Sequence, residues 1–239
     1  RGRGSDGRGH EEAIMLNTEI LEILSKSKSW GWVLEPDAKR ILSLAGISVP
    51  QFIWAQNLEE ALQFAEENEY PVVAKVVSPK VVHKTEVKGV ALGIDNKIAL
   101  AEAFHRFSSF DGAKGVLVEK SIKGIELIIG AKIDFQFGPV ILMGMGGTGV
   151  EIYQDASLRM APITPEDAVS MLKGLKAYRL LDGYRGAEPI DRDALTRMLV
   201  AFSDLIMAFD EKISSIDLNP VFCSAQTCVV GDARIMLPS

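Results

Sequence analysis

The sequence has little cysteine, no long apolar run and no excess of positive charge. Its two cysteines, Cys223 and Cys228, have no histidine nearby and make a poor zinc site, so we expect reduced thiols, with a hairpin disulfide as the alternative. The formal net charge of −6 predicts no attraction to nucleic acid or anionic lipid. No apolar run approaches the roughly 20 residues of a membrane span, and no signal peptide is visible. We therefore expect a soluble, cytoplasmic protein.

Helical and strand patterns alternate along the chain, which is typical of an α+β protein. Residues 1–10 form a low-complexity stretch that we expect to be disordered or a remnant of cloning. We expect N-terminal helices and a first subdomain in residues 11–110, and a second subdomain in residues 111–239. A long amphipathic helix over residues 192–209 precedes a terminal pair of strands.

The terminal pair of apolar segments, residues 215–222 and 230–234, predicts a hairpin. Side chains repeat with period two along a strand, so Asp217 and Asn219 would point to one face, within reach of Asp232. An amide oxygen and a carboxylate in apolar surroundings suit Mg²⁺, which typically takes one or two protein oxygens and completes its octahedron with phosphates and water. The alternative is that Asp217 and Asn219 cap a turn and Asp232 is a surface residue.

A glycine-rich loop, Gly144-Met-Gly146-Gly147-Thr-Gly149, follows a predicted strand and matches G-x-G-x-x-G. The dinucleotide-binding interpretation needs a helix to begin at this loop, and residues 150–157 show no convincing helical pattern. No Gly-Lys-Ser/Thr occurs, so the loop is not a Walker P-loop. The pattern predicts only backbone N–H groups able to approach an anion.

Lys75 and His83 lie close together in the chain, at the end of an apolar strand and in the polar loop after it. A cation in such a strand is costly unless it meets an anion, although strand lysines also extend along sheet edges for structural reasons. His83 has the structural interpretation open to most loop histidines. A neutral imidazole can also act as a nucleophile toward phosphorus, with neighbouring lysines screening the phosphoryl group.

Glu119 and Glu126 each interrupt an apolar strand, seven residues apart. One could accept a hydrogen bond from a base or ribose, and the other could approach a metal. Positions at a sheet edge or a barrel rim are the alternative.

Taken in chain order, these motifs resemble the ATP-grasp nucleotide-binding fold, an α+β fold whose two subdomains enclose a nucleotide site. The closer similarity is to the β subunit of NDP-forming acyl-CoA synthetases, the ADP-forming acetyl-CoA synthetase group, which is related to the succinyl-CoA synthetase β subunit. The resemblance covers about residues 30 to 237 and rests on these motifs: strand-Lys75, Ser78-Pro-x-x-x-His83-Lys84, Val-Glu119-Lys, Gly-x-Glu126-Leu, Gly-Met-Gly-Gly, Gly-Gly-x-x-Val150-Glu151, Asp155-x-Ser-x-Arg159-x-Ala-Pro, Asp217-Leu-Asn219-Pro and Gly-Asp232-Ala-Arg.

The resemblance implies a nucleotide site built from five of these positions. Lys75 would hold the phosphates, beneath a loop that includes Gly89. Glu119 and the backbone around Ile122 would face the adenine, and Glu126 would bind the ribose.

The resemblance also implies a metal site and a transfer site. Asn219 and Asp232 would hold Mg²⁺. His83 matches the second phosphohistidine of this group, and Asp217 matches an acidic position that steadies a phosphohistidine. Glu151 and Arg159 match family positions to which we assign no role.

The implied reaction is acyl-CoA + ADP + phosphate = acid + ATP + CoA, with the phosphoryl group relayed through histidine to ADP. The CoA-binding region and the first phosphohistidine of this group lie in a separate α part without a counterpart in this sequence, so we expect a hetero-oligomer with an α subunit. Two alternatives stay open: another ATP-grasp carboxylate ligase that forms an acyl phosphate without phosphohistidine, and a non-enzymatic dinucleotide-binding module.

Overall fold

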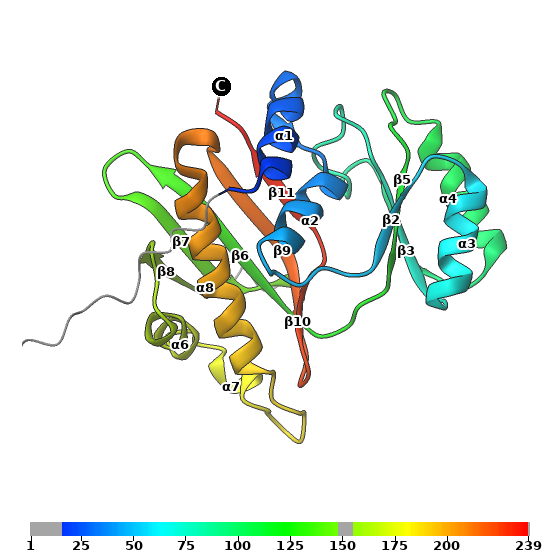
Figure 1. Cartoon of the computed structure of the whole chain (residues 1–239). Helices are drawn as coiled ribbons and strands as arrows, with labels where there is room; N and C mark the ends of the chain where they lie inside the picture. The colour runs from blue at the N-terminus through cyan, green and yellow to red at the C-terminus, as the bar shows by residue number, and fades with distance from the viewer. Residues whose placement is uncertain (1–15, 148–154, 239) are drawn as a thin grey trace, which may run out of the picture.

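Two antiparallel sheets, each covered by helices, form the part of the chain that the computed structural model describes, residues 16–147 and 155–238 (Figure 1). The larger sheet has the strand order β1-β11-β9-β6-β7-β8, and β10 pairs with β9 beside this path. Its strands are β1 (Trp32–Val33), β6 (Ile125–Asp134), β7 (Gly138–Met145), β8 (Ala156–Met160), β9 (Ser215–Cys223), β10 (Cys228–Val230) and β11 (Ala233–Met236). The smaller sheet has the order β2-β5-β3-β4, with β2 (Phe52–Ala55), β3 (Val72–Val76), β4 (Val90–Ile94) and β5 (Val116–Lys120).

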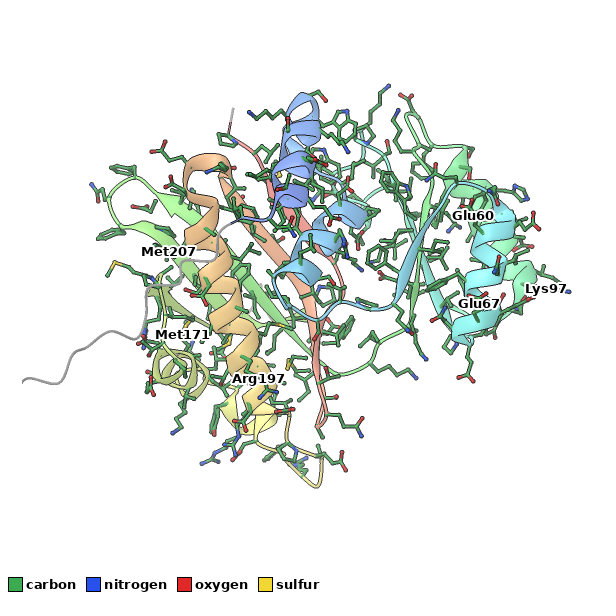
Figure 2. All side chains as sticks on the ribbon, in the orientation of Figure 1. Glu60, Glu67, Lys97, Met171, Arg197 and Met207 are labelled. Carbon is green, nitrogen blue, oxygen red and sulfur yellow. A yellow bond between two sulfur atoms is a disulfide. The ribbon has the colours of Figure 1, made fainter. Side chains whose placement is uncertain are left out.

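The helices of the larger sheet pack on one of its faces and enclose the main core (Figure 1). Phe202, Ile206 and Phe209 of the longest helix recur at helical spacing and are fully buried. Met171 of the neighbouring helix is buried too, whereas Met207 on the outer side is exposed (Figure 2). These elements are α1 (Thr18–Ser27), η1 (Lys28–Trp30), α2 (Glu35–Leu44), α6 (Pro165–Lys173), α7 (Tyr178–Leu181), α8 (Arg192–Phe209) and η3 (Asp210–Lys212).

The smaller sheet is covered by α3 (Leu58–Asn68) and α4 (Lys97–Ser108), whose polar residues Glu67 and Lys97 lie on the solvent side (Figure 2). Alternate residues of β3 and β5, such as Ala74 and Val118, pack against these helices. Because side chains alternate along a strand, Lys75 and Glu119 lie on the opposite face, toward the larger sheet. That second face carries the charges discussed below.

The two larger cores divide the chain differently from the expected boundary at residue 110, and a small third cluster of Trp32, Leu34, Val77 and Leu117 lies between them. The smaller sheet extends through Lys120, because β5 is one of its inner strands. The helices α1 and α2 belong to the core of the larger sheet, because their apolar faces pack there. A division by core therefore places residues 52–120 in one unit and the remaining described residues in the other.

The terminal strands form a longer arrangement than the expected single hairpin. The strand β9 pairs with β10, and after residues 231 and 232 the chain pairs with β9 again as β11. Cys223 and Cys228 are opposite each other across β9 and β10, with Cα atoms 4.2 Å apart, and they form a disulfide. The expectation of reduced thiols is wrong, because the register places both sulfurs together. Within the described ranges, no helix is long and apolar enough to cross a membrane.

Candidate active site

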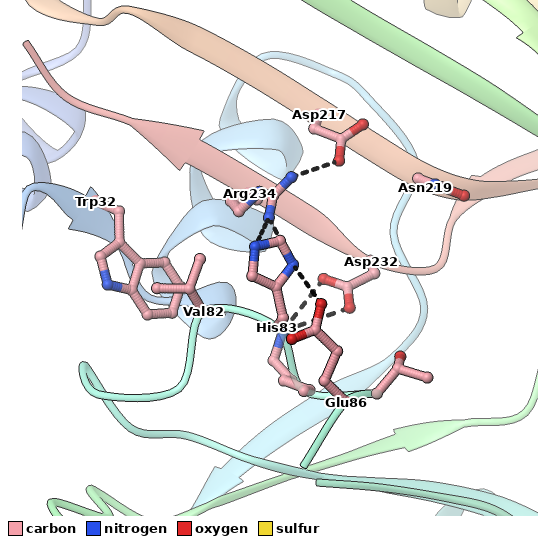
Figure 3. Close-up of a pocket in the computed structure, with 10 residues that line it drawn as sticks. Trp32, Val82, His83, Glu86, Asp217, Asn219, Asp232 and Arg234 are labelled. Atoms are coloured by element: carbon pink, nitrogen blue, oxygen red, sulfur yellow. Dashed lines mark hydrogen bonds and ion pairs between the residues drawn. The ribbon is translucent and has the colours of Figure 1, made fainter. Parts of the chain in front are cut away.

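A polar cavity of about 250 Å³ lies between the β3–β4 loop and the terminal strands (Figure 3). The loop contributes His83, Lys84 and Glu86, and strands β9 and β11 and the β10–β11 connection contribute the remaining charged side chains. The full lining is Trp32, Val82, His83, Lys84, Thr85, Glu86, Asp217, Asn219, Asp232 and Arg234. The predicted catalytic and metal-binding residues therefore lie around one cavity.

The strand alternation of β9 explains which side chains reach the cavity. Ile216 and Leu218 are buried in the main core, so Asp217 and Asn219 point to the other face. Asp217 is directly opposite Arg234 in the β9–β11 register. The Asn219 N–H donates to the Asp232 carbonyl at 3.1 Å, which brings these two residues together.

His83 is in contact with Arg234 rather than with Asp217. One guanidinium nitrogen of Arg234, Nη1, lies 3.3 Å from His83 Nδ1 and 3.4 Å from Nε2. The other, Nη2, donates to Asp217 Oδ2 at 3.1 Å. The His83 side chain is 58% exposed, and its nearest carboxylate is Glu86, at 3.9 Å from Nδ1. The imidazole is thus open to a group entering the cavity.

The oxygens of Asn219 and Asp232 fit a magnesium ion that keeps phosphate and water ligands. Mg²⁺ typically takes few protein oxygens, and both residues line the cavity. The described residues contain no cluster of three or more His, Cys, Asp or Glu that could bind a metal by protein side chains alone. Burial and the nearby Glu35 carboxylate raise the pKa of Asp232, against the opposing pull of the Lys75, Lys84 and Lys39 ammonium groups.

Beside the cavity lies a set of three lysines and three carboxylates, which we call the ion cluster: Glu35, Lys39, Lys75, Lys84, Glu119 and Asp232. The Lys75 Nζ atom lies 2.7 Å from Glu35 Oε1, 2.8 Å from Glu119 Oε1 and 2.7 Å from the Gly231 carbonyl oxygen. An ammonium group has three donors, so Lys75 has none left. It does not line the cavity.

Lys84 is the ammonium of the ion cluster that also lines the cavity. It lies 2.8 Å from Glu35 Oε2 and 3.4 Å from both oxygens of Asp232. Glu119, predicted to face the adenine, is buried and paired with Lys39 and Lys75.

Sequence reasoning missed Glu35 and Lys39 of α2. Both side chains have no exposed surface, and Lys39 also donates to the Gly231 carbonyl at 2.9 Å. Their spacing of four residues on the stripe that holds Ala38 and Leu42 was the available signal, because charges on an apolar helix face need buried partners. Burial alone would raise the pKa of Glu35, but attraction by the Lys75, Lys84 and Lys39 ammonium groups outweighs it and holds that pKa well below its usual range.

The remaining predicted residues lie away from the cavity or outside the described ranges. Ile122 is half-buried in the β5–β6 connection, and Glu126 is exposed beside Gly147. Gly89 is the last residue of the β3–β4 loop, residues 77–89, which we call the histidine loop. Its N–H donates to the Lys84 carbonyl at 2.7 Å and closes the loop. Arg159 donates to Ser170 at 3.1 Å on α6, and Glu151 lies outside the described residues.

The glycine-rich loop after β7 belongs to an antiparallel sheet. A dinucleotide-binding fold places its glycine motif between a parallel strand and a helix, and all described strand pairs here are antiparallel. Gly146 instead bonds its N–H to the Glu126 carbonyl at 2.7 Å. Residues 148–154 of the loop lie outside the described residues. The topology therefore disfavours the dinucleotide-binding alternative.

Comparison with known proteins identifies the family of this chain. Residues 25–237 match the ATP-grasp domain family. The chain is 41% identical over 225 residues to the beta subunit of ADP-forming acetate–CoA ligase I of Pyrococcus furiosus, covering 90% of this chain and 97% of that protein. It is 42% identical over 226 residues to the ADP-forming acetate–CoA ligase I of Archaeoglobus fulgidus, covering 92% of this chain and 33% of that longer protein.

A solved structure agrees with these relatives. It is a dinucleotide-forming acetyl-coenzyme A synthetase 1 of Ca. Korarchaeum cryptofilum in complex with coenzyme A and Mg-AMPPCP, with its phosphohistidine segment pointing towards the nucleotide-binding site. Its TM-score is 0.81 at 38% identity, with 92% of this chain and 100% of that chain covered. The expected α+β ATP-grasp fold is confirmed. The chain belongs to the ATP-grasp family and, within it, to the β subunits of ADP-forming acetyl-CoA synthetases.

Proposed function

We propose that this chain is the nucleotide-binding β subunit of an ADP-forming acyl-CoA synthetase, which catalyses acyl-CoA + ADP + phosphate = acid + ATP + CoA. The single observation that carries the proposal is the cavity that places His83 of the β3–β4 loop opposite Asp217, Asn219 and Asp232 of the terminal strands. A histidine beside oxygen ligands and cations suits phosphoryl transfer, which needs positioning and charge neutralisation more than covalent chemistry.

His83 would accept the phosphoryl group and then release it to ADP. In the first step an imidazole nitrogen attacks phosphorus, the bond from phosphorus to the donor breaks, and the imidazole loses its proton. In the second step a β-phosphate oxygen of ADP attacks, the N–P bond breaks, and the nitrogen recovers a proton. The exposure of the imidazole, whose only carboxylate contact within the described residues is the long one to Glu86 at 3.9 Å, supports this use as a carrier.

Two cations would neutralise the phosphoryl oxygens. Arg234 already contacts the imidazole, and its planar fork suits bidentate contact with phosphate. Lys84 follows His83 in the chain and lines the cavity. Asp217 would steady phosphorylated His83 through Arg234, because the carboxylate accepts from that guanidinium.

The nucleotide would lie against the same cavity. Asn219 and Asp232 would hold Mg²⁺, which neutralises phosphate charge when bound. Lys75, Gly89, Glu119, Ile122 and Glu126 remain our proposed nucleotide contacts. Because the three donors of Lys75 are taken, its contact with a phosphate requires release of one present partner.

The CoA-binding α subunit with the first phosphohistidine would be the partner of this chain. The Archaeoglobus fulgidus relative supports a separate α part, because this chain matches only 33% of the length of that protein. The isolated chain should bind nucleotide and show no acyl-CoA turnover. Robust turnover by the pure chain would contradict this division of labour.

Titration calorimetry and histidine labelling test the proposal on the chain alone. ADP and ATP should bind in a Mg²⁺-dependent manner, and γ-labelled ATP should transfer label to His83 as an acid-labile, base-stable product. Binding of NAD, or nucleotide binding that ignores Mg²⁺, would contradict the proposal.

A further inference from the structure

Glu35 is a buried carboxylate to which the mechanism above gives no role. It is the first residue of α2, and its side chain has no exposed surface. The N-terminal end of a helix favours a negative charge, which helps to keep this group ionised. Its position on α2 places it between the core of the larger sheet and the charged face of the smaller one.

Each oxygen of Glu35 forms an ion pair with a lysine from a different segment. Oε1 lies 2.7 Å from Lys75 of β3, and Oε2 lies 2.8 Å from Lys84 of the histidine loop. Lys39, one turn along α2, adds a third contact at 3.2 Å. One carboxylate therefore joins β3, the histidine loop and α2.

The Lys84 ammonium is held by two carboxylates, of which Glu35 is the closer and the more deeply buried. Lys84 is 2.8 Å from Glu35 but 3.4 Å from either oxygen of Asp232. The Lys84 carbonyl in turn accepts the Gly89 N–H at 2.7 Å, which closes the loop. Lys84 is thus held at both its side chain and its backbone, directly next to His83.

Stability alone does not account for so many buried charges. A buried ion pair is often no better for stability than apolar residues of similar volume, because desolvation offsets the attraction. Apolar residues cannot, however, hold a charged group in a fixed position.

We infer that Glu35 is a positioning residue for phosphoryl transfer: it anchors Lys84, and through it the loop that carries His83, to the strand that carries Lys75. The inference rests on the proposed function for its catalytic consequence and on the contacts above for the anchoring itself. A small displacement of a reacting group can cost on the order of 100-fold in rate, so the anchoring has a measurable kinetic effect.

The test compares the full chain with Glu35→Gln, and with Glu19→Gln as a matched control. Glu19 also pairs with α2, through Arg40, but on the exposed side. We expect Glu35→Gln to slow His83 labelling at saturating Mg-ATP by about 100-fold, to change nucleotide affinity by less than about tenfold, and to speed amide hydrogen exchange in residues 78–89. Glu19→Gln should match the wild type in all three.

The outcomes separate the two proposals. If the wild type binds nucleotide and labels His83, equal saturating labelling rates in wild type and Glu35→Gln overturn the inference. If the wild type takes up no label, the proposed function fails, and loop exchange alone decides the anchoring: unchanged exchange in Glu35→Gln overturns it. If Glu35→Gln does not fold, Lys84→Met removes the same tie from the loop, and unchanged exchange in residues 78–89 of that variant overturns the inference.

Discussion

Arg234 and Asp217 are direct cross-strand partners, and the guanidinium of Arg234 lies between the Asp217 carboxylate and the His83 imidazole. Asp217 therefore contacts His83 only through Arg234 in this structure. A carboxylate that holds a guanidinium in place can present it to an incoming phosphoryl group at little cost in side-chain entropy. In the proposed mechanism, Arg234 would contact the phosphoryl group directly and Asp217 would orient Arg234.

Replacement of Arg234 should slow the transfer step without weakening nucleotide binding. We expect Arg234→Gln to lower the single-turnover rate of His83 labelling by about 100-fold, the scale of a lost preorganised donor. Arg234→Lys should recover part of this rate, because it keeps the charge but not the planar fork. Equal rates in wild type and Arg234→Gln, measured by rapid quench, would remove Arg234 from the transfer site.

His83→Asn should abolish acid-labile labelling and leave Mg-ADP affinity within about twofold of wild type, since in the proposed mechanism the imidazole is the nucleophile and not a nucleotide ligand. The matched control is His105→Asn, on the helix α4 that covers the smaller sheet, which should label normally. Undiminished phosphoryl transfer in His83→Asn would instead favour a carboxylate ligase that forms its acyl phosphate without phosphohistidine.

Asp232→Ala should remove most of the Mg²⁺ dependence of nucleotide binding. With few protein ligands to the ion, loss of one carboxylate should weaken Mg-ADP binding by at least about tenfold in calorimetry. Asp111→Ala is the control, because Asp111 pairs with Lys80 on the surface. A titration of Asp232→Ala that matches wild type, with and without Mg²⁺, would mean that the terminal strands have no metal-binding role.

Glu35→Gln should change the acid stability of the chain in a defined direction. The pKa of Glu35 is lowered in the folded state relative to about 4.3 in an unfolded chain. Its ionisation therefore contributes stability that is fully present above about pH 4.3 and is lost as the pH falls toward the folded pKa. At neutral pH, loss of one member of a buried ion cluster should cost about 3–5 kcal/mol.

The wild-type advantage in unfolding free energy over Glu35→Gln should thus shrink below about pH 4.3, by at most roughly 1.4 kcal/mol per pH unit. Urea unfolding from pH 7 to pH 3 measures this difference. Glu19→Gln should show a much smaller effect, since exposed ion pairs contribute little. A difference that stays constant over this range would contradict the burial of an ionised Glu35.

Gly89→Ala should distort the histidine loop. A Cβ at this position would lie 2.6 Å from Val76 Cγ1 and 3.2 Å from the Lys84 carbonyl oxygen, so the loop or β3 has to move. We expect a lower thermal midpoint and slower His83 labelling, with Gly186→Ala as a control at a glycine with open space around it. Because Gly186 has a positive φ, this control should lose some stability but keep its labelling rate.

Local pattern in the sequence was sufficient for most of the fold. The expected helix over residues 192–209 agrees with α8, because a continuous apolar stripe and an Asp191 N-cap define both its face and its start. Period-two alternation placed Asp217 and Asn219 on one face of β9, and both line the cavity. The ordered motifs were enough to identify the ATP-grasp family, which residues 25–237 match.

Contacts between distant segments were decided only by the tertiary structure. The hydrogen bonds of Lys75 reach Glu35 and Gly231, 40 and 156 residues away, and no local period reports such partners. The same holds for Arg234 beside His83, and for β5, whose pairing extends the smaller sheet past residue 110. A sequence determines which face of an element is apolar, but the partner of a buried charge depends on how whole elements pack. For this chain, the ion pairs that Glu35 and Lys39 of α2 form across the two sheets decided that two predicted nucleotide contacts, Lys75 and Glu119, belong to the ion cluster.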